Sequence, residues 1–525
     1  MADVLPDDIE ALKAIIQLQN VRILEFEKKL AWADEKYRAM ELRYFGKKSE
    51  RYSATEDKQN RLFDEAEEYG DSASEKPAAI DTIRVPAHER KKPGRKQKLV
   101  ATEHVEIVHD LGDEEKRCPC CGKERPRIGE DRTSEYDLVP AHVVEHVHIV
   151  RKYGPCSCEA FGEEGKAPII AAVGPAKIIP GSDFTNRTIA FFMTAKYSDA
   201  IPFYRMEKML ARDGLIVSRA ALCNQAVAVG RAIAELLEAM DRDIRSSPVI
   251  LMDETTVQVL KDERGPPGRK SYMWLSRGYR DGRPIHLFRY HATRAGEFAS
   301  RLLQGYRGYL QTDGYSGYNQ VGESPGIIHV GCFAHIRRKF HEAWETAGKT
   351  GAAQHGLELI QRLYGIESSC RSRLETNAID SSGFLAERRR GVEPIIAEFR
   401  SWLERTGYAT APQSALGKAI KYAQGQIDRA ARFLDHELMT PDTNAAENAI
   451  RPFVVGRKNW LFSGSPLGAH ASAGIYSLIE TAKANRHEPF AYLSYLFDRL
   501  PRCGSTEEKL ALLPYRCSPS VYAEN

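Results

Sequence analysis

The sequence lacks several features that mark large classes of proteins. No apolar run reaches the roughly 20 residues that a membrane-spanning helix requires, and mean hydropathy is -0.45. The first residues, MADVLPDDIEALK, lack the basic and then apolar pattern of a secretory signal peptide. The net charge is also small, at +3. We therefore expect a soluble, cytoplasmic protein with no membrane partner.

Length and local charge indicate several domains. At 525 residues and 59.0 kDa the chain is too long for one core. The small net charge hides an acidic block at residues 55–75 and a basic arm at residues 84–98. Arg95 and Lys96, within PGRK, are candidates for contacts with DNA phosphates. A solvated linker over residues 53–98 is the equally favoured alternative.

Apolar residues recur at heptad spacing near the start of the chain. One series is Ile9, Ile16, Ile23, Leu30 and Tyr37, and the other is Leu12, Phe26, Ala33 and Met40, with Gln19 as a polar exception. This spacing predicts a coiled-coil helix over residues 1–52 and a homo-oligomer formed through it. An amphipathic helix lying on the body of the protein is the alternative.

Cysteines cluster over residues 99–165. Two pairs, Cys118 with Cys121 and Cys156 with Cys158, flank the alternating segments SEYDLVPA and VVEHVHIVRKY, which we interpret as strands. Four thiolates on two turns suit tetrahedral zinc, so we expect a structural zinc module. The second pair is spaced more tightly than usual, and Cys120, His146 or His148 are possible replacements for one of its sulfurs. A cluster of reduced cysteines without metal is the other possibility.

Residues 166–247 are mainly helical by periodicity. A helix, a turn at Gly214 and a second helix starting at Ser218 resemble a helix-turn-helix, whose second helix can enter the major groove of DNA. Many helical hairpins have this pattern without touching DNA, so a DNA-binding region is one of two interpretations.

Strand patterns follow over residues 248–334. Three β-rich runs, PVILMDETTVQVL, KSYMWLSRGY and RPIHLFRYHA, are separated by turn segments and predict an antiparallel meander. A helix in RAGEFASRLLQ, a strand in GYLQTDGYSGYN, and a strand and helix in GIIHVGCFAHIRRKF complete an order close to the ribonuclease H-like fold. Asp253 then lies on the first strand and Asp313 at the end of the fourth. Those strands are neighbours in that fold, so the two carboxylates should meet.

Paired carboxylates are ligands for Mg2+ or Mn2+, which can activate a nucleophile and stabilise a leaving oxygen in phosphoryl transfer. A third ligand is needed, and TPDTNAAENAIRPFVVGRKNW offers Glu447. Asp442 competes with it, but we interpret Asp442 as a cap at the start of the helix. Glu254 follows Asp253 on the opposite side of the strand, so it is expected to face solvent or support the site rather than bind metal.

Long motifs give a more specific indication. LMDETTVQVL, LQTDGYSGYN, GCFAHIRRKF and NAAENAIRPFVVGRKNWLFSGSPLGAHASAGIYSLIETAKANRHEPFAYL resemble those of the insertion sequence sixty-six family of bacterial DDE transposases, and the resemblance covers nearly the whole chain. It implies a DNA transposase with a ribonuclease H-like catalytic domain and a metal-binding triad at Asp253, Asp313 and Glu447. It also implies double-stranded DNA as partner, accessory proteins encoded by the same element, and a bacterial cytoplasmic protein that joins the nucleoid when bound to DNA. The second cysteine pair departs from the commonest family pattern.

The expected class is therefore multidomain α+β. Residues 248–334 and 441–500 form the catalytic domain, residues 335–440 a helical insertion of unknown role, and residues 501–525 a C-terminal tail. Five basic residues are candidates for holding phosphates, or else form a solvated basic face: Arg337, Arg338, Arg451, Arg457 and Lys458.

Alternative interpretations apply to three residues near the predicted triad and to the function. Trp460 either stacks on an unpaired base or packs in the core, and packing is favoured over a metal-binding role for Cys332 with His335. A nuclease that cuts without joining, and a non-enzymatic DNA-binding repressor or scaffold, are the alternative functions.

Overall fold

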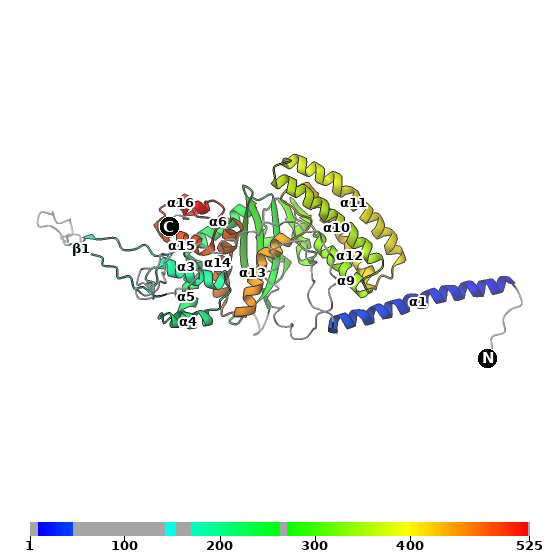
Figure 1. Ribbon diagram of the computed structural model, residues 1–525, viewed down its shortest axis with the longest axis horizontal. Helices are drawn as coiled ribbons and strands as arrows, with labels where there is room; N and C mark the ends of the chain where they lie inside the picture. Colours follow the sequence, from blue (N-terminus) through cyan, green and yellow to red (C-terminus); the bar gives the residue numbers. More distant parts are fainter. Residues whose placement is uncertain (1–8, 46–141, 154–169, 263–269, 523–525) are drawn as a thin grey trace, which may run out of the picture. The chain divides into compact units, whose positions relative to one another are not determined.

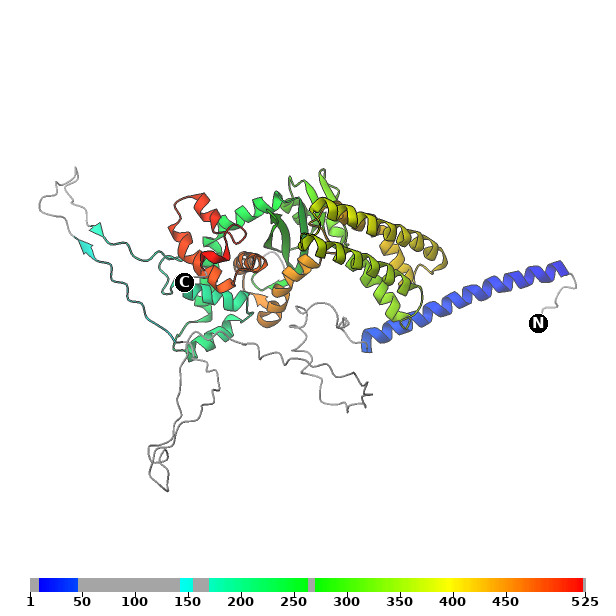
Figure 2. The same cartoon turned by 45° about the horizontal axis from the view of Figure 1, so that its top comes forward.

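The structure is a computed structural model that describes residues 9–45, 142–153, 170–262 and 270–522 (Figures 1 and 2). Several sequence predictions lie outside these ranges. They are the acidic linker and basic arm with Arg95 and Lys96, the first alternating segment, and the cysteines of the zinc module, Cys118, Cys120, Cys121, Cys156 and Cys158.

A mixed sheet forms the centre of the described fold. Its strands are β3 (Val249–Val259), β4 (Lys270–Arg280), β5 (Arg283–His291), β6 (Gly308–Gln311) and β7 (Ile327–Val330), in the order β5-β4-β3-β6-β7, and β8 (Phe462–Ser463) pairs with the far end of β3. β3, β4 and β5 make the predicted antiparallel meander, whereas β6 runs parallel to β3 and β7 parallel to β6. The prediction that the first and fourth strands are neighbours is confirmed.

Turn chemistry and a covering helix define the β5 edge. The turn between β4 and β5 holds Asp281 at φ 52° and Gly282 at φ 74°, the left-handed backbone that Asp-Gly hairpins adopt. Along the outer side of β5, the Phe288 amide donates to Ser477 Oγ at 2.8 Å, and the His286 amide donates to Thr481 Oγ1 at 3.0 Å. Both acceptors belong to α14 (Pro466–Ala484). The helix therefore satisfies an edge that would otherwise be open to pairing.

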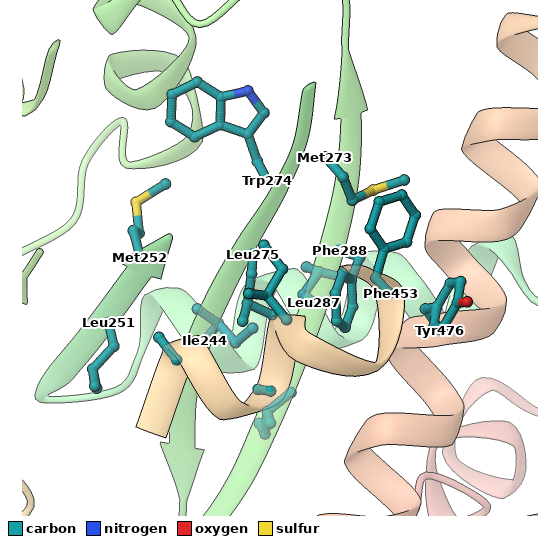
Figure 3. Packing of buried hydrophobic residues seen from close by; sticks show 14 of the residues in the cluster. Ile244, Leu251, Met252, Met273, Trp274, Leu275, Leu287, Phe288, Phe453 and Tyr476 are labelled. Atoms are coloured by element: carbon teal, nitrogen blue, oxygen red, sulfur yellow. The ribbon is translucent and has the colours of Figure 1, made fainter. Parts of the chain in front are cut away.

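Helices cover both faces of the sheet. α13 (Asn444–Trp460) and α14 bring Phe453 and Tyr476 against Met273 and Phe288, as Figure 3 shows. On the other face, α6 (Ala234–Arg245) approaches β4 so closely that a Cβ at Gly278 would lie 3.2 Å from the Ile244 Cα atom. Strand register places Asp253 on the face of Met273 and Phe288, and Glu254 on the opposite face.

The predicted helical insertion is present as a bundle beside the sheet (Figures 1 and 2). It comprises α9 (Phe333–Thr346), α10 (Ala352–Glu375), α11 (Ser381–Ala409), α12 (Ala415–Ala431) and a 3-10 turn at Arg432–Asp435. Phe340, Phe399 and Trp402 form its aromatic core, with ring centroids 5.5 to 5.8 Å apart.

The helix, turn and second helix predicted around Gly214 are also confirmed. α4 spans Phe203–Arg212, Gly214 has φ 91°, and Ser218 Oγ accepts the Ala221 amide at 3.2 Å to start α5 (Arg219–Ala232). The remaining elements of this side and of the sheet connections are α3 (Asn186–Tyr197), α7 (Gly296–Leu302), α8 (Asn319–Gly322), α15 (Pro489–Arg499), α16 (Thr506–Ala511) and 3-10 turns at Ser316–Tyr318, Leu500–Arg502 and Pro519–Val521.

The residues expected to form a C-terminal tail are folded as far as residue 522. Tyr515 and Cys517 are buried. Tyr515 Oη and Arg516 Nη2 each donate to Asp243 Oδ2 at 2.7 Å. This end of the chain is part of the core and not a loose extension.

Two further elements, a long N-terminal helix and a short strand pair, are not part of the central sheet. α1 (Ile9–Phe45) is a helix of 37 residues, and its heptad residues Ile9, Ile16, Ile23, Leu30 and Tyr37 are 53 to 68% exposed. β1 (Lys152–Tyr153) and β2 (Ile170–Ala171) form a short antiparallel pair. The strand expected over residues 143–153 is thus limited to its last two residues.

No single helix within the described ranges is long and apolar enough to cross a membrane. The bent pair of α5 and α6 meets the length and composition criteria only when its two helices are joined across a 52° bend. Its apolar residues Leu222, Val229, Leu236 and Met240 are buried in the core, as is common for core helices of a globular protein.

Candidate active site

Asp253, within β3, and Asp313, just after β6, lie where the parallel pairing of these two strands ends. The β3–β6 pairing ends at Leu251 and Gln311, and each aspartate follows two residues later. Asp313 Oδ1 accepts the Tyr315 amide at 3.0 Å, which turns the chain away from the sheet. Asp253 Oδ1 accepts the Glu254 amide at 2.8 Å.

Glu447 lies in the first turn of α13, the helix that covers the Asp253 face. Thr443 precedes this helix, and its Oγ1 donates to Glu447 Oε1 at 3.3 Å. Asp442 Oδ1 accepts the Asn444 amide at 3.1 Å, and Oδ2 accepts Asn444 Nδ2 at 2.9 Å. The interpretation of Asp442 as a residue that satisfies the start of the helix is confirmed.

Electrostatics show that the acids are close enough to influence one another. Burial is the largest of the causes that together raise the pKa of Asp253 to about 7, and the negative charges of Glu254, Glu447 and Asp313 contribute after it, in that order. Asp253 therefore responds to both other members of the predicted triad.

Glu254 supports the strand from the opposite face. Its side chain is 2% exposed, so of the two places expected for it the structure agrees with support of the site and not with solvent, and burial raises its pKa. Arg294 Nε donates to Glu254 Oε1 at 2.6 Å, and the Tyr318 hydroxyl donates to Oε2. The Arg294 guanidinium in turn lies 3.6 Å from the centre of the Tyr315 ring. This network links the loop after Asp313 to the strand that carries Asp253.

Cys332 is buried beside Glu447's helix and makes structural contacts. Its Sγ accepts the Thr443 amide at 3.4 Å and also lies 3.4 Å from Thr443 Oγ1, and burial raises the pKa of the thiol to about 11. This agrees with packing as the favoured interpretation. His335 is influenced by two acids of the predicted triad. Burial lowers its pKa, while the charges of Glu447 and Asp313 act in the opposite direction.

Tyr422 of α12 is a site residue that the sequence did not reveal. A Cβ at Gly314 would lie 2.1 Å from the Tyr422 hydroxyl oxygen, so a larger residue after Asp313 would require the Tyr422 side chain to shift. Burial raises the pKa of Tyr422 to about 12, and Asp313 contributes next. Its only sequence signal would be a tyrosine on a distant helix, which no local pattern connects to Asp313.

The predicted phosphate-binding residues are not gathered in one place. Arg457 Nη1 donates to Thr256 Oγ1 at 2.8 Å and to Thr255 Oγ1 at 3.3 Å, so it fastens α13 to β3. Arg457 and Lys458 do line one cavity of about 400 Å³, together with Thr256, Val257, Gln258, Lys270 and Leu461. Arg338 and Arg451 are exposed and Arg337 is half-buried. The Trp460 ring packs 5.4 Å from that of Phe453, as its core interpretation predicts.

Within the described residues no group of three or more His, Cys, Asp or Glu side chains is arranged closely enough to hold a metal ion. The donor chemistry nevertheless fits Mg2+ or Mn2+, because the converging groups are carboxylates. Their mutual repulsion, which appears in the raised pKa of Asp253, is the kind that a bound cation relieves.

A mixed α+β domain with carboxylates converging from two parallel strands and a covering helix is typical of proteins that act on phosphate esters with divalent metals. Comparison with known families then identifies the chain. The sequence model of the family described as "Transposase IS66 family" matches residues 181–471, more than half of the chain. The chain belongs to this family, which confirms the resemblance. "IS66 C-terminal element" matches residues 477–515, and "Transposase C of IS166 homeodomain" matches residues 32–107.

Three relatives from Sinorhizobium fredii (strain NBRC 101917 / NGR234) are similar over most of their length. Uncharacterized protein y4qI is 28% identical over 554 residues, covering 98% of each chain. Uncharacterized protein y4jD is 27% identical over 77% of this chain and 78% of its own. Uncharacterized protein y4hP is 25% identical over 82% of this chain and 78% of its own.

Proposed function

We propose that this protein is a DNA transposase that binds the terminal inverted repeats of its element, cuts at their ends and joins the freed 3′ hydroxyl to target DNA. The family supports the class of protein. The influence of Glu447 and Asp313 on Asp253 is the observation that supports the catalytic assignment. We also propose that the sheet and its covering helices are a ribonuclease H-like fold, since the strand order and the parallel β3–β6 pair agree with it.

In this proposal Asp253, Asp313 and Glu447 would hold Mg2+ or Mn2+, which would supply an activated nucleophile and stabilise the leaving oxygen. The rest of the work falls to the chain. Glu254, bonded to Arg294 and to Tyr318, ties β3 to the segment that follows Asp313. Asp253 must be ionised to act as a ligand, and without a cation burial and the neighbouring negative charges raise its pKa to about 7.

DNA and assembly contacts are proposed from the remaining features. Lys458 and Lys270 line the cavity beside α13, and we propose that they contact the DNA backbone. The exposed heptad residues of α1 support a homo-oligomer. Zinc at the cysteine pairs, phosphate contacts from Arg95, Lys96, Arg337, Arg338 and Arg451, major-groove contact by α5, accessory proteins and a place on the bacterial nucleoid stay predictions.

The experiment is incubation of the purified chain with Mg2+ and duplex DNA carrying the element's ends, followed by separation of cut and joined products. Asp313→Asn should lower cleavage by at least about a hundredfold, the upper end of what losing an outer-shell partner of a metal ligand costs. Asp281→Asn is the matched control, because Asp281 is exposed in a hairpin turn whose left-handed backbone asparagine tolerates.

The outcomes separate the alternatives. Cleavage without joined product would favour a ribonuclease H-like nuclease, and DNA binding without cleavage by the unaltered chain would favour a repressor or scaffold. Full activity of Asp313→Asn would contradict the assignment of the triad.

A further inference from the structure

The segment between the helical insertion and α13 is held from both sides. We call residues 433–443 the strap. It starts within the 3-10 turn Arg432–Asp435, ends at Thr443, and leads directly into the helix that carries Glu447. Its backbone carbonyls are bonded to side chains of the insertion near its start and to the sheet domain near its end.

On the insertion side, Arg388 of α11 holds three carbonyls of the strap. Arg388 is fully buried. Its Nη1 donates to the Phe433 and His436 carbonyls at 2.8 and 3.1 Å, and Nη2 donates to the Met439 carbonyl at 2.7 Å. One planar guanidinium thus fixes the path of seven consecutive residues, a task that suits its rigid fork of donors.

The burial of this charge is balanced by Glu367 of α10. Arg388 Nε and Nη2 each donate to the Glu367 carboxylate at 2.8 Å. A second arginine, Arg371, donates to Glu367 Oε1 at 2.7 Å and to the Met439 carbonyl at 3.0 Å. Buried ion pairs are tolerated only when the remaining donors are satisfied, and here the strap carbonyls satisfy them. The charge network and the path of the strap therefore depend on each other.

Near its end, the strap is bonded to the last residue of β6 and to the start of α9. Gln311, the last residue of β6, is buried and its Nε2 donates to the Thr440 carbonyl at 2.7 Å. The Phe333 amide donates to the Pro441 carbonyl at 2.8 Å. Thr443 then donates to Cys332 and to Glu447. A continuous set of bonds thus runs from Arg388 to Glu447.

We propose that Arg388 and Glu367 are positioning residues that fix the strap and thereby place Glu447 against Asp253 and Asp313. This assigns a role to the helical insertion: it holds the third carboxylate in register with the sheet. The consequence for catalysis rests on the proposed function, whereas the consequence for the order of the strap does not.

The test uses the full chain with Arg388→Lys. Lysine keeps the charge but cannot reach Glu367 and three carbonyls together. Hydrogen exchange measured by mass spectrometry should become faster in peptides covering residues 433–447 and stay unchanged in β3 and β4. Cleavage should fall by about tenfold to a hundredfold, because small misplacements of catalytic groups have effects of this size. The Mg2+ concentration that gives half-maximal activity should rise. Arg400→Lys is the control, since Arg400 is on the same helix but forms an exposed pair with Asp428 at 2.7 Å.

A second variant covers the case in which Arg388→Lys loosens the whole insertion. Gln311→Met removes the bond to the Thr440 carbonyl with little change in volume, and should loosen the same strap peptides and lower cleavage. Faster exchange in the strap with unchanged cleavage and unchanged Mg2+ dependence in both variants would overturn the proposal, and so would unchanged exchange.

Failure of the proposed function is distinguishable. If the unaltered chain does not cut DNA, Mn2+ affinity measured by calorimetry replaces cleavage. Weaker Mn2+ binding by Arg388→Lys but not by Arg400→Lys supports the positioning role, and equal binding by all three proteins contradicts it.

Discussion

Two regions of the protein bury carboxylates, and they treat them in opposite ways. In the insertion, Glu367 is buried between Arg388 and Arg371, which donate to both of its oxygens. At the acid site, burial and the charges of Glu254 and Glu447 act together and raise the pKa of Asp253 to about 7. The charge of Glu367 is balanced by arginines of the same chain, whereas the carboxylates around Asp253 repel one another.

The difference separates a structural ion pair from a site prepared for a ligand. A balanced cluster gains nothing from an added cation, whereas crowded carboxylates are costly until a cation arrives. Removing a carboxylate should therefore destabilise the first region and stabilise the second. The predictions below test that contrast, from the largest expected effect to the smallest.

Glu367→Gln should destabilise the protein by about 3–5 kcal/mol, because it leaves Arg388 buried without its counter-charge. Urea unfolding followed by circular dichroism measures the change. Glu398→Gln, in an exposed pair with Arg362, is the control and should change stability by less than about 1 kcal/mol. Equal effects of the two substitutions would contradict the structural role of the buried pair.

Mg2+ or Mn2+ should stabilise the unaltered chain by about 2.7 kcal/mol at a concentration one hundred times its dissociation constant. The rise in Tm on adding the cation measures this effect. Asp313→Asn should remove most of the rise, and Glu398→Gln, in the exposed pair with Arg362, should leave it in place. A rise of the same size in Asp313→Asn would place the cation elsewhere.

Asp253→Asn should stabilise the protein in the absence of divalent metal at high pH only. The folded pKa of Asp253, about 7, lies above its ordinary value of 3.8, so the folded state holds a proton that the unfolded state has lost between these values. Stability of the unaltered chain therefore falls as pH rises from 3.8 to about 7. Asparagine removes that loss, and should add about 1–3 kcal/mol above pH 7 and almost nothing near pH 4.

Thermal unfolding at those two pH values, in a buffer with a chelator, measures the difference. A variant that is equally stabilised at both would show that the gain comes from something other than the charge of Asp253.

Arg400→Ala should have the smallest effect, below about 1 kcal/mol, because its pair with Asp428 is exposed on both sides. Thermal unfolding at low and high salt measures it. A loss as large as that of Glu367→Gln would erase the distinction between buried and exposed charges of the insertion.

The order of strands, the meeting of the first and fourth strands and the cap at Asp442 were predictable, because each follows from local periodicity or from a residue's place before a helix. Contacts between distant polar groups were not. The sequence makes Arg457 a candidate for a phosphate contact, but in the structure its side chain donates hydrogen bonds to two threonines of β3. Tyr422 and Arg388 lie on amphipathic helices, whose periodicity does not show which distant groups they contact. Tertiary packing decides which buried donor bonds to which carbonyl, and the periodicity of the sequence does not predict these pairs.

Glu447 follows the strap in the sequence, and this order affects how the protein folds during its synthesis. Asp253 and Asp313 leave the ribosome before the insertion, and Glu447 leaves after it. Domains generally fold as units during synthesis, so the insertion can fold and receive the strap before Glu447's helix is complete. A chain interrupted within the insertion would carry two of the three acids and no means of placing the third.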